Sequence, residues 1–235
     1  MGIDTKLNIN SFNNGKTFIT KLWNCARCII SKNNRTIINN PTSINKWIVS
    51  RLHQTINQLN QYLNNYQFHE YAIKLYDFVW NEFGNFYLEI TKFYSDDMTL
   101  STLNDVFSSI LKMAHPLIPF VTEKIWKLMY NKSILTERWP LVNNDHIDTF
   151  LEINIKNIQE LLTHIRNIKK NFKGHLELLI DGDILLSELD YIKRLVTMRD
   201  HSQFTLITSL DPHKSYIRHN LNFATIHYHL IPLTQ

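Results

Sequence analysis

The sequence predicts a mainly α-helical bundle followed by a small α/β module. Three observations lead to this fold class. Apolar residues recur at helical spacing in long blocks as far as Tyr130. Only 5 glycines and 6 prolines interrupt the 235 residues, which favours long helices over many short strands. After Trp139 and Pro140 the blocks become shorter and some read as strands, so the chain changes character there.

The apolar stripes predict five amphipathic helices in the bundle, over residues 13–30, 44–64, 68–90, 100–114 and 121–130. Each helix is one-sided, so burial of the shared apolar stripe must stabilise it. Pro116 and Pro119 separate the last two helices, because proline is tolerated in the first turn of a helix but not in its interior.

The rest of the chain predicts a second, smaller module. Asn143, Asn144 and Asp145 read as a linker. We expect a helix over 150–172, a second helix over 185–196, and strands over 175–180, 204–208 and 224–230. The expected domains are therefore a bundle over 1–145 and a helix with an α/β module over 146–235.

Charge is distributed unevenly along the chain. The net charge of +4 is mild, but the segment from Thr5 to His69 contains no Asp or Glu. That segment holds eight basic residues, namely Lys6, Lys16, Lys21, Arg27, Lys32, Arg35, Lys46 and Arg51. Such an asymmetry suggests an anionic partner, and a solvated surface with scattered lysines is the alternative.

The first helix has the composition of a nucleic-acid contact. Lys16, Lys21, Asn24 and Arg27 follow one another at steps of three to five residues, compatible with one polar face. Arg and Asn can read base edges by paired hydrogen bonds, and Lys can neutralise phosphate. On spacing alone, nucleic-acid binding is favoured only slightly over a solvated helix face.

No motif for catalysis or metal binding stands out. Cys25 and Cys28 form a C-x-x-C pair without a second ligand pair, in the middle of a helix, so ordinary packing is the favoured interpretation. His227 and His229 share a strand face, but no third ligand is evident. Phosphate-loop, dinucleotide and nucleophile-elbow motifs do not occur. No signal peptide opens the chain and no apolar run approaches the ~18 residues of a membrane span, so we expect a cytoplasmic protein.

Five ordered motifs resemble the anticodon-binding domain of valyl-tRNA synthetases. They lie at Gly15–Arg27, Trp47–Leu52, Tyr76–Phe83 with Phe86–Glu89, His115–Trp126, and Arg138–Pro140. Isoleucyl and leucyl synthetases share the bundle, but Trp80–Phe83 looks more like the valine enzyme. The HIGH-type and KMSKS-type signatures of the catalytic domain do not occur in this sequence.

The resemblance implies a C-terminal piece of a valine–tRNA ligase. A valine-specific tRNA and the catalytic domain of the same polypeptide are the implied partners, and we expect a monomer. The full enzyme would use ATP and Mg²⁺, whereas this piece would bind no cofactor and be inactive alone. We expect phosphate contacts from Lys16, Lys21, Lys46 and Arg51, and base contacts from Asn24 and Arg27. Arg166, Lys169 and Lys170 could extend the basic surface towards the tRNA body.

Three departures from the family pattern are visible. Cys28 stands where the family usually has a phenylalanine expected near the anticodon. Gly84, Asn85 and Phe86 stand where Cys-Asp-Trp is common, which we interpret as core variation. The end of the chain lacks the charged coiled coil of many bacterial members. The rival hypothesis is a helical protein-interaction module without a role in RNA binding, which predicts binding with little salt dependence. RNA binding predicts a steep fall with salt. A free-standing enzyme is excluded by the lack of any catalytic constellation.

Overall fold

The computed structural model describes residues 9–32, 42–92, 96–170, 174–182 and 204–232. The chain divides into two compact units, Met1–Thr149 and Phe150–Gln235, where the sequence suggested a boundary at 145/146. The first unit is helical, and the second combines one described helix with a four-stranded sheet. The predicted fold class, a mainly α bundle followed by a small module with strands, is confirmed.

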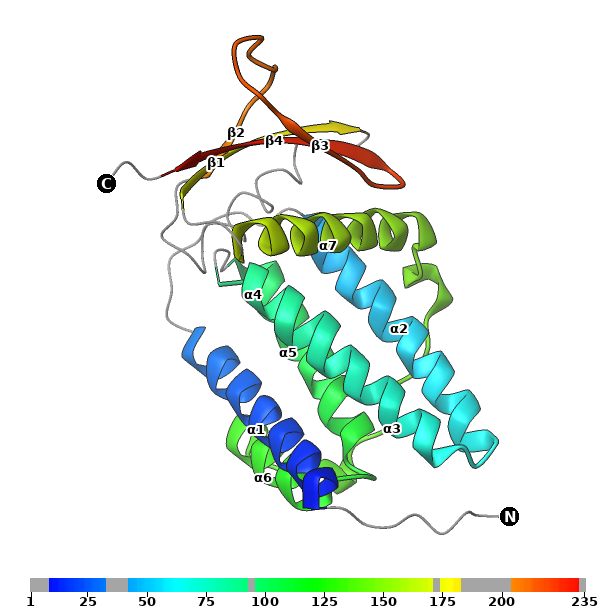
Figure 1. Ribbon diagram of the computed structural model, residues 1–235. Coiled ribbons are helices and arrows are strands. Elements are labelled where there is room, and N and C mark those ends of the chain that lie inside the picture. The colour runs from blue at the N-terminus through cyan, green and yellow to red at the C-terminus, as the bar shows by residue number, and fades with distance from the viewer. Residues whose placement is uncertain (1–8, 33–41, 93–95, 171–173, 183–203, 233–235) are drawn as a thin grey trace. The chain divides into compact units, whose positions relative to one another are not determined.

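The helices of the first unit follow the order expected from the apolar stripes (Figure 1). They are α1 (Ile9–Lys32), α2 (Thr42–Asn64), α3 (Phe68–Asp77), the π-helix η1 (Phe78–Tyr87), α4 (Leu88–Ile90), α5 (Asp97–Ala114), α6 (Pro119–Tyr130), and the short 3₁₀ turns η2 (Ile134–Thr136) and η3 (Asn144–His146). Among these described residues, no helix is both long and apolar enough to cross a membrane.

Helix ends follow ordinary capping chemistry. Asp96 caps α5, because its carboxylate accepts a hydrogen bond from the backbone N–H of Thr99 at 2.6 Å. Pro119 occupies the first turn of α6, which begins two residues before the predicted start at 121. His115, at the end of α5, has its Nδ1 2.8 Å from the hydroxyl of Thr122, which joins the two helices across the proline-containing turn.

The expected third helix, 68–90, is continuous but not α-helical throughout. Its middle, η1, is a π-helix, and the N–H of Leu88 donates to the carbonyl of Phe83, five residues earlier. Buried residues recur at that five-residue step, as Phe78 with Phe83 and Val79 with Gly84. The predicted helix over 68–90 is therefore confirmed as one continuous helical segment, and its π-helical middle is a feature that the apolar stripe did not indicate.

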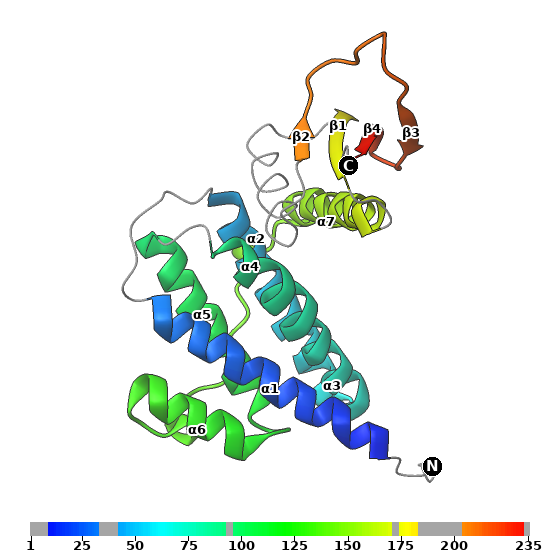
Figure 2. The ribbon, with the colours of Figure 1, turned by 60° about the vertical axis from the view of Figure 1, so that its left-hand side comes forward.

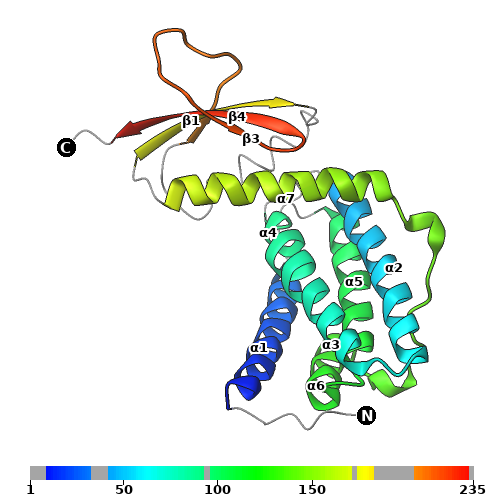
Figure 3. The ribbon, with the colours of Figure 1, turned by 45° about the vertical axis from the view of Figure 1, so that its right-hand side comes forward.

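The core of the first unit is built around η1. Both α1 and α2 pack against it, as Figure 3 shows for α1 on one side and α2 on the other. Phe83 is fully buried and stacks on Phe107 of α5, with ring centroids 5.8 Å apart and planes at 16°. Tyr87 is buried and donates its hydroxyl hydrogen to Asn45 of α2 at 2.8 Å. On its other side, α1 contacts α5 and α6 (Figure 2).

The segment expected to be a linker is held against α2. Its 3₁₀ turn η3 places the Nδ1 of His146 3.1 Å from the Nε2 of His53, and the N–H of Asn143 donates to the other ring nitrogen of His53. The N–H of Asp148 donates to the hydroxyl of Ser50. Burial, and then the neighbouring His146 ring, lower the pKa of His53 below its ordinary value. A neutral His53 can keep accepting the Asn143 hydrogen bond.

In the second unit, α7 (Thr149–Lys170) lies along one face of a four-stranded sheet. The sheet order is β2 (Phe204–Leu206), β1 (Gly174–Gly182), β4 (Ala224–Pro232) and β3 (Ile217–Asn220), with only β1 and β2 parallel. The three predicted strands are confirmed, but β3 was missed because all four of its residues are exposed and lack an alternating pattern. The predicted helix 185–196 lies outside the described residues.

The placement of Phe83 predicts a large loss of stability when its ring is removed. Phe83→Ala should lower the free energy of unfolding by about 4 kcal/mol, because the substitution leaves a cavity between η1 and α5. Phe120 is the matched control, since its side chain is 89% exposed and its replacement by Ala should change little. Urea unfolding followed by circular dichroism measures both. Equal effects from the two substitutions would contradict the central position of η1.

Candidate nucleic-acid interface

One side of α1 forms a continuous polar surface. Lys16, Thr20, Asn24, Arg27 and Ser31 are all exposed at steps of three or four residues, which places them on one face of the helix. The α1 sequence contains no Asp or Glu. We call these five residues the α1 face. It presents two cations, an amide and two hydroxyls without a carboxylate on the same helix.

Lys21 lies at the edge of the α1 face and reaches across η1. Its Nζ donates to the side-chain oxygen of Asn85 at 2.7 Å and lies 5.2 Å from the ring centroid of Trp80. A Cβ placed on Gly84 would be 2.3 Å from the Cε of Lys21, so the side chain passes through space that only glycine leaves open. The ammonium group is thus fixed in place by η1 rather than extended into solvent.

Arg51 of α2 is engaged on several of its nitrogens. Its Nε and Nη2 donate to the two carboxylate oxygens of Glu82 at 2.7 and 2.8 Å, and its Nη1 donates to Gln54 at 2.8 Å. This paired geometry is the strongest that a guanidinium forms with a carboxylate. Arg51 therefore ties α2 to η1, and much of its hydrogen-bonding capacity is used inside the protein.

Four of the six residues predicted to contact tRNA are exposed, namely Lys16, Asn24, Arg27 and Lys46. Lys46 stands in the first turns of α2. The last turn of α1 and the first turn of α2 lie at the same end of the bundle (Figures 1 and 3). The other two predicted residues, Lys21 and Arg51, are held by η1. Contact of these six residues with tRNA stays a prediction.

A sixth basic residue of α1 and α2 has a structural role. Lys32, at the end of α1, is only 3% exposed, and its Nζ donates to both the carbonyl and the hydroxyl of Thr91. Thr91 follows α4 directly. The buried ammonium therefore joins the end of α1 to the segment that continues η1, and it is not available to a ligand.

The C-x-x-C pair behaves as helix packing. Cys25 is buried and Cys28 is half-buried, and both are free thiols. Burial raises the pKa of Cys25 to about 12, and nearby Lys21 lowers it only in part. A thiol with that pKa is a poor nucleophile and a poor metal ligand. In the part of the chain that the structure describes, no group of three or more His, Cys, Asp or Glu residues could hold a metal ion.

Four tryptophans of the bundle helices divide into two kinds. Trp47 and Trp126 are 2% and 3% exposed and belong to the core. Trp23 and Trp80 are half-buried. Trp80 stacks on Tyr76 with centroids 5.4 Å apart and planes at 9°, so one face of its ring is covered by Tyr76 and Lys21 approaches the ring as well.

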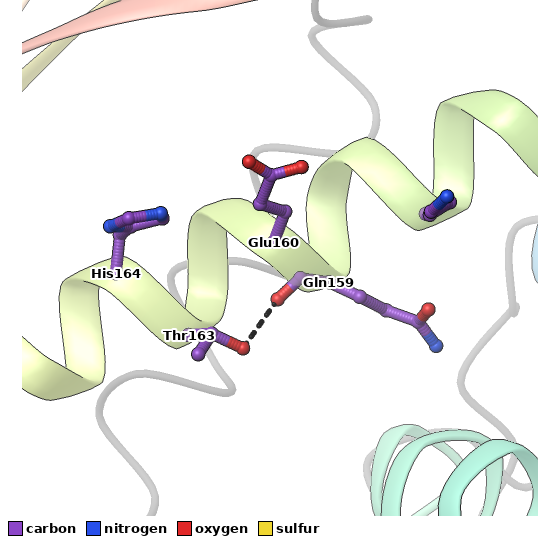
Figure 4. Close-up of a pocket in the computed structure, with 5 residues that line it drawn as sticks. Gln159, Glu160, Thr163 and His164 are labelled. Carbon is purple, nitrogen blue, oxygen red and sulfur yellow. Dashed lines mark hydrogen bonds between the residues drawn. The ribbon is translucent and has the colours of Figure 1, made fainter. Parts of the chain in front are cut away.

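In the second unit, α7 carries a shallow pocket along its side, lined by Lys156, Gln159, Glu160, Thr163 and His164 (Figure 4). The hydroxyl of Thr163 donates to the carbonyl of Gln159, and the His164 ring lies 4.7 Å from that of His219 on β3. On β4, His227 and His229 alternate with the buried Ile226 and so share the opposite sheet face. The basic cluster of α7 includes Lys170, which is exposed.

A family model of the anticodon-binding domain of tRNA ligase matches residues 45–178. The chain belongs to this family. The match begins inside α2, so α1 lies outside it and the α1 face is not part of what the model recognises. The match extends through the rest of the bundle and α7 into β1.

The chain is also similar to valine–tRNA ligases. It is 32% identical to that of Listeria monocytogenes over 183 residues, which cover 72% of this chain and 21% of the relative. It is 33% identical to that of Blochmanniella floridana over 190 residues, and 29% identical to that of Petrotoga mobilis over 234 residues, which cover 91% of this chain. The chain spans between 20% and 27% of the length of these relatives.

Sequence reasoning missed the residues that position the predicted cations. Gly84 and Asn85 were interpreted as core variation, which is wrong for Asn85, because its side chain is exposed and accepts a hydrogen bond from Lys21. Glu82 was not given a positioning role, although it fixes Arg51. Asn85 is 64 residues from Lys21 along the chain, so no local spacing could have signalled the contact. The only signal was the lack of acids from Thr5 to His69, which required any neutralising group to come from a later segment.

The burial of Cys25 predicts that the two thiols differ in reactivity. In the folded chain, Ellman's reagent should modify one thiol quickly, that of Cys28, and both only after unfolding, because the Cys25 thiol is inaccessible and stays protonated. In the folded Cys28→Ser variant, no thiol should react quickly with Ellman's reagent. Fast modification of Cys25 in the folded protein would contradict the packing described here.

The Cys25 thiol also makes the free energy of unfolding depend on pH. In the unfolded chain the Cys25 thiol ionises near its ordinary value of 9.0, whereas in the folded chain it ionises near 12. Between about pH 9 and pH 12 the folded state therefore holds one proton more than the unfolded state. The contribution of this proton to the free energy of unfolding is fully present below pH 9 and is lost as the pH rises towards 12. The slope should approach about 1.4 kcal/mol per pH unit, and Cys25→Ala should flatten it. Urea unfolding between pH 8 and about 9.5, below the ordinary tyrosine pKa of about 10, measures the slope.

Proposed function

We propose that this chain recognises the anticodon end of a valine-specific tRNA as part of a valine–tRNA ligase. The observation behind the proposal is the α1 face, an exposed row of basic and amide side chains without carboxylates, on a domain of the anticodon-binding family. Lysines on such a surface neutralise phosphates, and Asn and Arg can read unstacked bases of a loop. The valine preference is supported by the relatives in whose names it stands.

Within this proposal the six predicted residues have different roles. Lys16 and Lys46 contact phosphates, and Asn24 and Arg27 contact bases, because all four are exposed. Lys21 contacts a phosphate from its fixed position on η1. Arg51 acts mainly by holding η1 to α2 through its ion pair with Glu82.

The complete ligase would attach valine to the tRNA with the use of ATP and Mg²⁺. The residues described here do not fit that chemistry, since they form no acidic or histidine cluster for a metal ion and the sequence has no nucleotide-binding signature. ATP and Mg²⁺ therefore belong to other parts of the ligase, and the chain supplies recognition as a monomer in the cytoplasm beside the catalytic domain.

A binding assay tests the proposal. The chain should bind a valine tRNA transcript with an affinity that falls steeply as salt rises, and transcripts changed at the middle and third anticodon letters should bind less tightly. Equal, salt-sensitive binding to all transcripts would leave a phosphate clamp without anticodon recognition. The rival protein-interaction module, favoured by the exposed Phe120 and Leu128 on α6, predicts no salt-sensitive tRNA binding at all.

Arg27→Ala gives the sharpest single test of base recognition. Removing a base contact should cost about 1–3 kcal/mol of binding free energy and reduce the preference for the valine anticodon. Arg138→Ala is the matched control, because Arg138 is also exposed in the bundle but stands outside α1 and α2, and it should leave the preference unchanged. Weaker binding with an unchanged preference in Arg27→Ala would show that Arg27 contacts only phosphate.

A further inference from the structure

The contacts that three residues of η1 make with Lys21 are the strongest feature of the chain to which no role has yet been given. Three residues of η1 act on this one side chain: Trp80 lies beneath its ammonium, Gly84 leaves room for its Cε, and Asn85 accepts its hydrogen bond. We call Trp80, Gly84 and Asn85 the Lys21 cradle. Each contact restricts the same side chain in a different way, by attraction to a ring, by open space and by a directed hydrogen bond.

The cradle orients the ammonium group without neutralising it. Asn85 is uncharged and occupies one of the three N–H donors of Lys21, and Trp80 contributes only a ring face. Among the ion pairs of the described residues, none involves Lys21. Arg51 shows the contrast, because η1 gives it a carboxylate, Glu82. The same π-helix thus neutralises one cation and leaves the other charged.

An oriented, charged lysine is what a fixed phosphate contact requires. A free lysine loses about 2 kcal/mol of rotamer entropy when it is immobilised. In this chain, folding already restricts the Lys21 side chain, so less entropy is lost when RNA binds. More of the charge interaction then contributes to the affinity. Lys21 is half-buried at the edge of the α1 face, so a phosphate that reaches this edge meets the two remaining donors.

We propose that the Lys21 cradle is a preformed phosphate contact for an RNA backbone, with Trp80, Gly84 and Asn85 as positioning residues that act through Lys21. The inference rests on the proposed function and deepens it, because it assigns part of the tRNA contact to η1, whose Asn85 is 64 residues from Lys21 along the chain. It also explains why η1 carries a glycine among large aromatic residues.

A double-substitution cycle tests the proposal on the whole chain with a valine tRNA transcript. Lys21→Met should reduce the slope of log affinity against log salt by about 0.7–0.9, the contribution of one phosphate contact. If the two proteins bind RNA equally well at 1 M salt, this difference in slope makes Lys21→Met bind roughly five- to eightfold more weakly than the unsubstituted chain at 0.1 M salt. Asn85→Ala should weaken binding in the same direction, and should have no further effect in the Lys21→Met background.

Two variants separate positioning from a structural effect. Asn81→Ala is the matched control, because Asn81 lies four residues before Asn85 in η1 and its amide donates to Asp77 instead of holding a lysine, so binding should not change. Gly84→Ala should lower the salt slope as Lys21→Met does, since the added Cβ would stand 2.3 Å from the Cε of Lys21. That Cβ would also stand 2.9 Å from the backbone carbonyl oxygen of Val79, so Asn85→Ala is the variant that tests positioning and Gly84→Ala supports it. Thermal unfolding of each variant shows whether it is folded at the assay temperature.

The outcomes distinguish this inference from the proposed function. If the unsubstituted chain does not bind the transcript, the proposed function fails and the inference fails with it. If the chain binds but Lys21→Met leaves the salt slope unchanged, only the inference is overturned. Equal weakening by Asn85→Ala in both backgrounds would overturn it too, because Asn85 would then act independently of Lys21.

Discussion

The packing of two basic helices against η1 is the interaction on which the bundle depends. Neither α1 nor α2 contains an acidic residue, so neither can balance its own cations. The π-helix and the residue that follows α4 provide the partners: Asn85 for Lys21, Glu82 for Arg51 and Thr91 for Lys32. The same stretch buries Phe83 and Tyr87, so hydrophobic burial and charge pairing act through one segment.

This arrangement separates the cations of the two helices into an inner and an outer group. The inner group, Lys21, Arg51 and Lys32, contacts η1 or Thr91 and joins the two helices to that segment. The outer group, Lys16, Arg27 and Lys46, is exposed and is available to an anion. A surface of this kind can bind phosphate without unfolding any internal contact, which suits a recognition domain that must keep its shape when RNA binds.

Much of the fold could be predicted from the sequence. The apolar stripes predicted the helices of the bundle, because burial of one helix face imposes a 3.6-residue period on the chain. The family was predicted from the resemblance of the five ordered motifs, and the family model confirms it. The π-helix could not be predicted in this way, since Phe78, Phe83 and Tyr87 fit an α-helical stripe almost as well. The strand β3 gave no signal because an exposed edge strand needs no apolar alternation.

The candidate site was predictable as a surface but not as a set of contacts. Composition and spacing identified α1 as basic, and the structure places Lys16, Asn24 and Arg27 on one exposed face. Spacing could not show that Lys21 and Arg51 would be held by side chains of η1, because those contacts join residues 64 and 31 positions apart. Long-range pairing of this kind is a product of the fold and is not encoded in any local pattern.

The most direct test of this account is lysine footprinting by acetylation and mass spectrometry, with and without a valine tRNA. Lys16 and Lys46 should lose reactivity when tRNA is bound, because both belong to the exposed outer group. Lys127 and Lys132, which pair with Glu123 and Glu137 away from α1 and α2 in sequence, should keep theirs. Protection of Lys127 and Lys132 with unchanged Lys16 and Lys46 would contradict the assignment of the RNA-binding surface to α1 and α2.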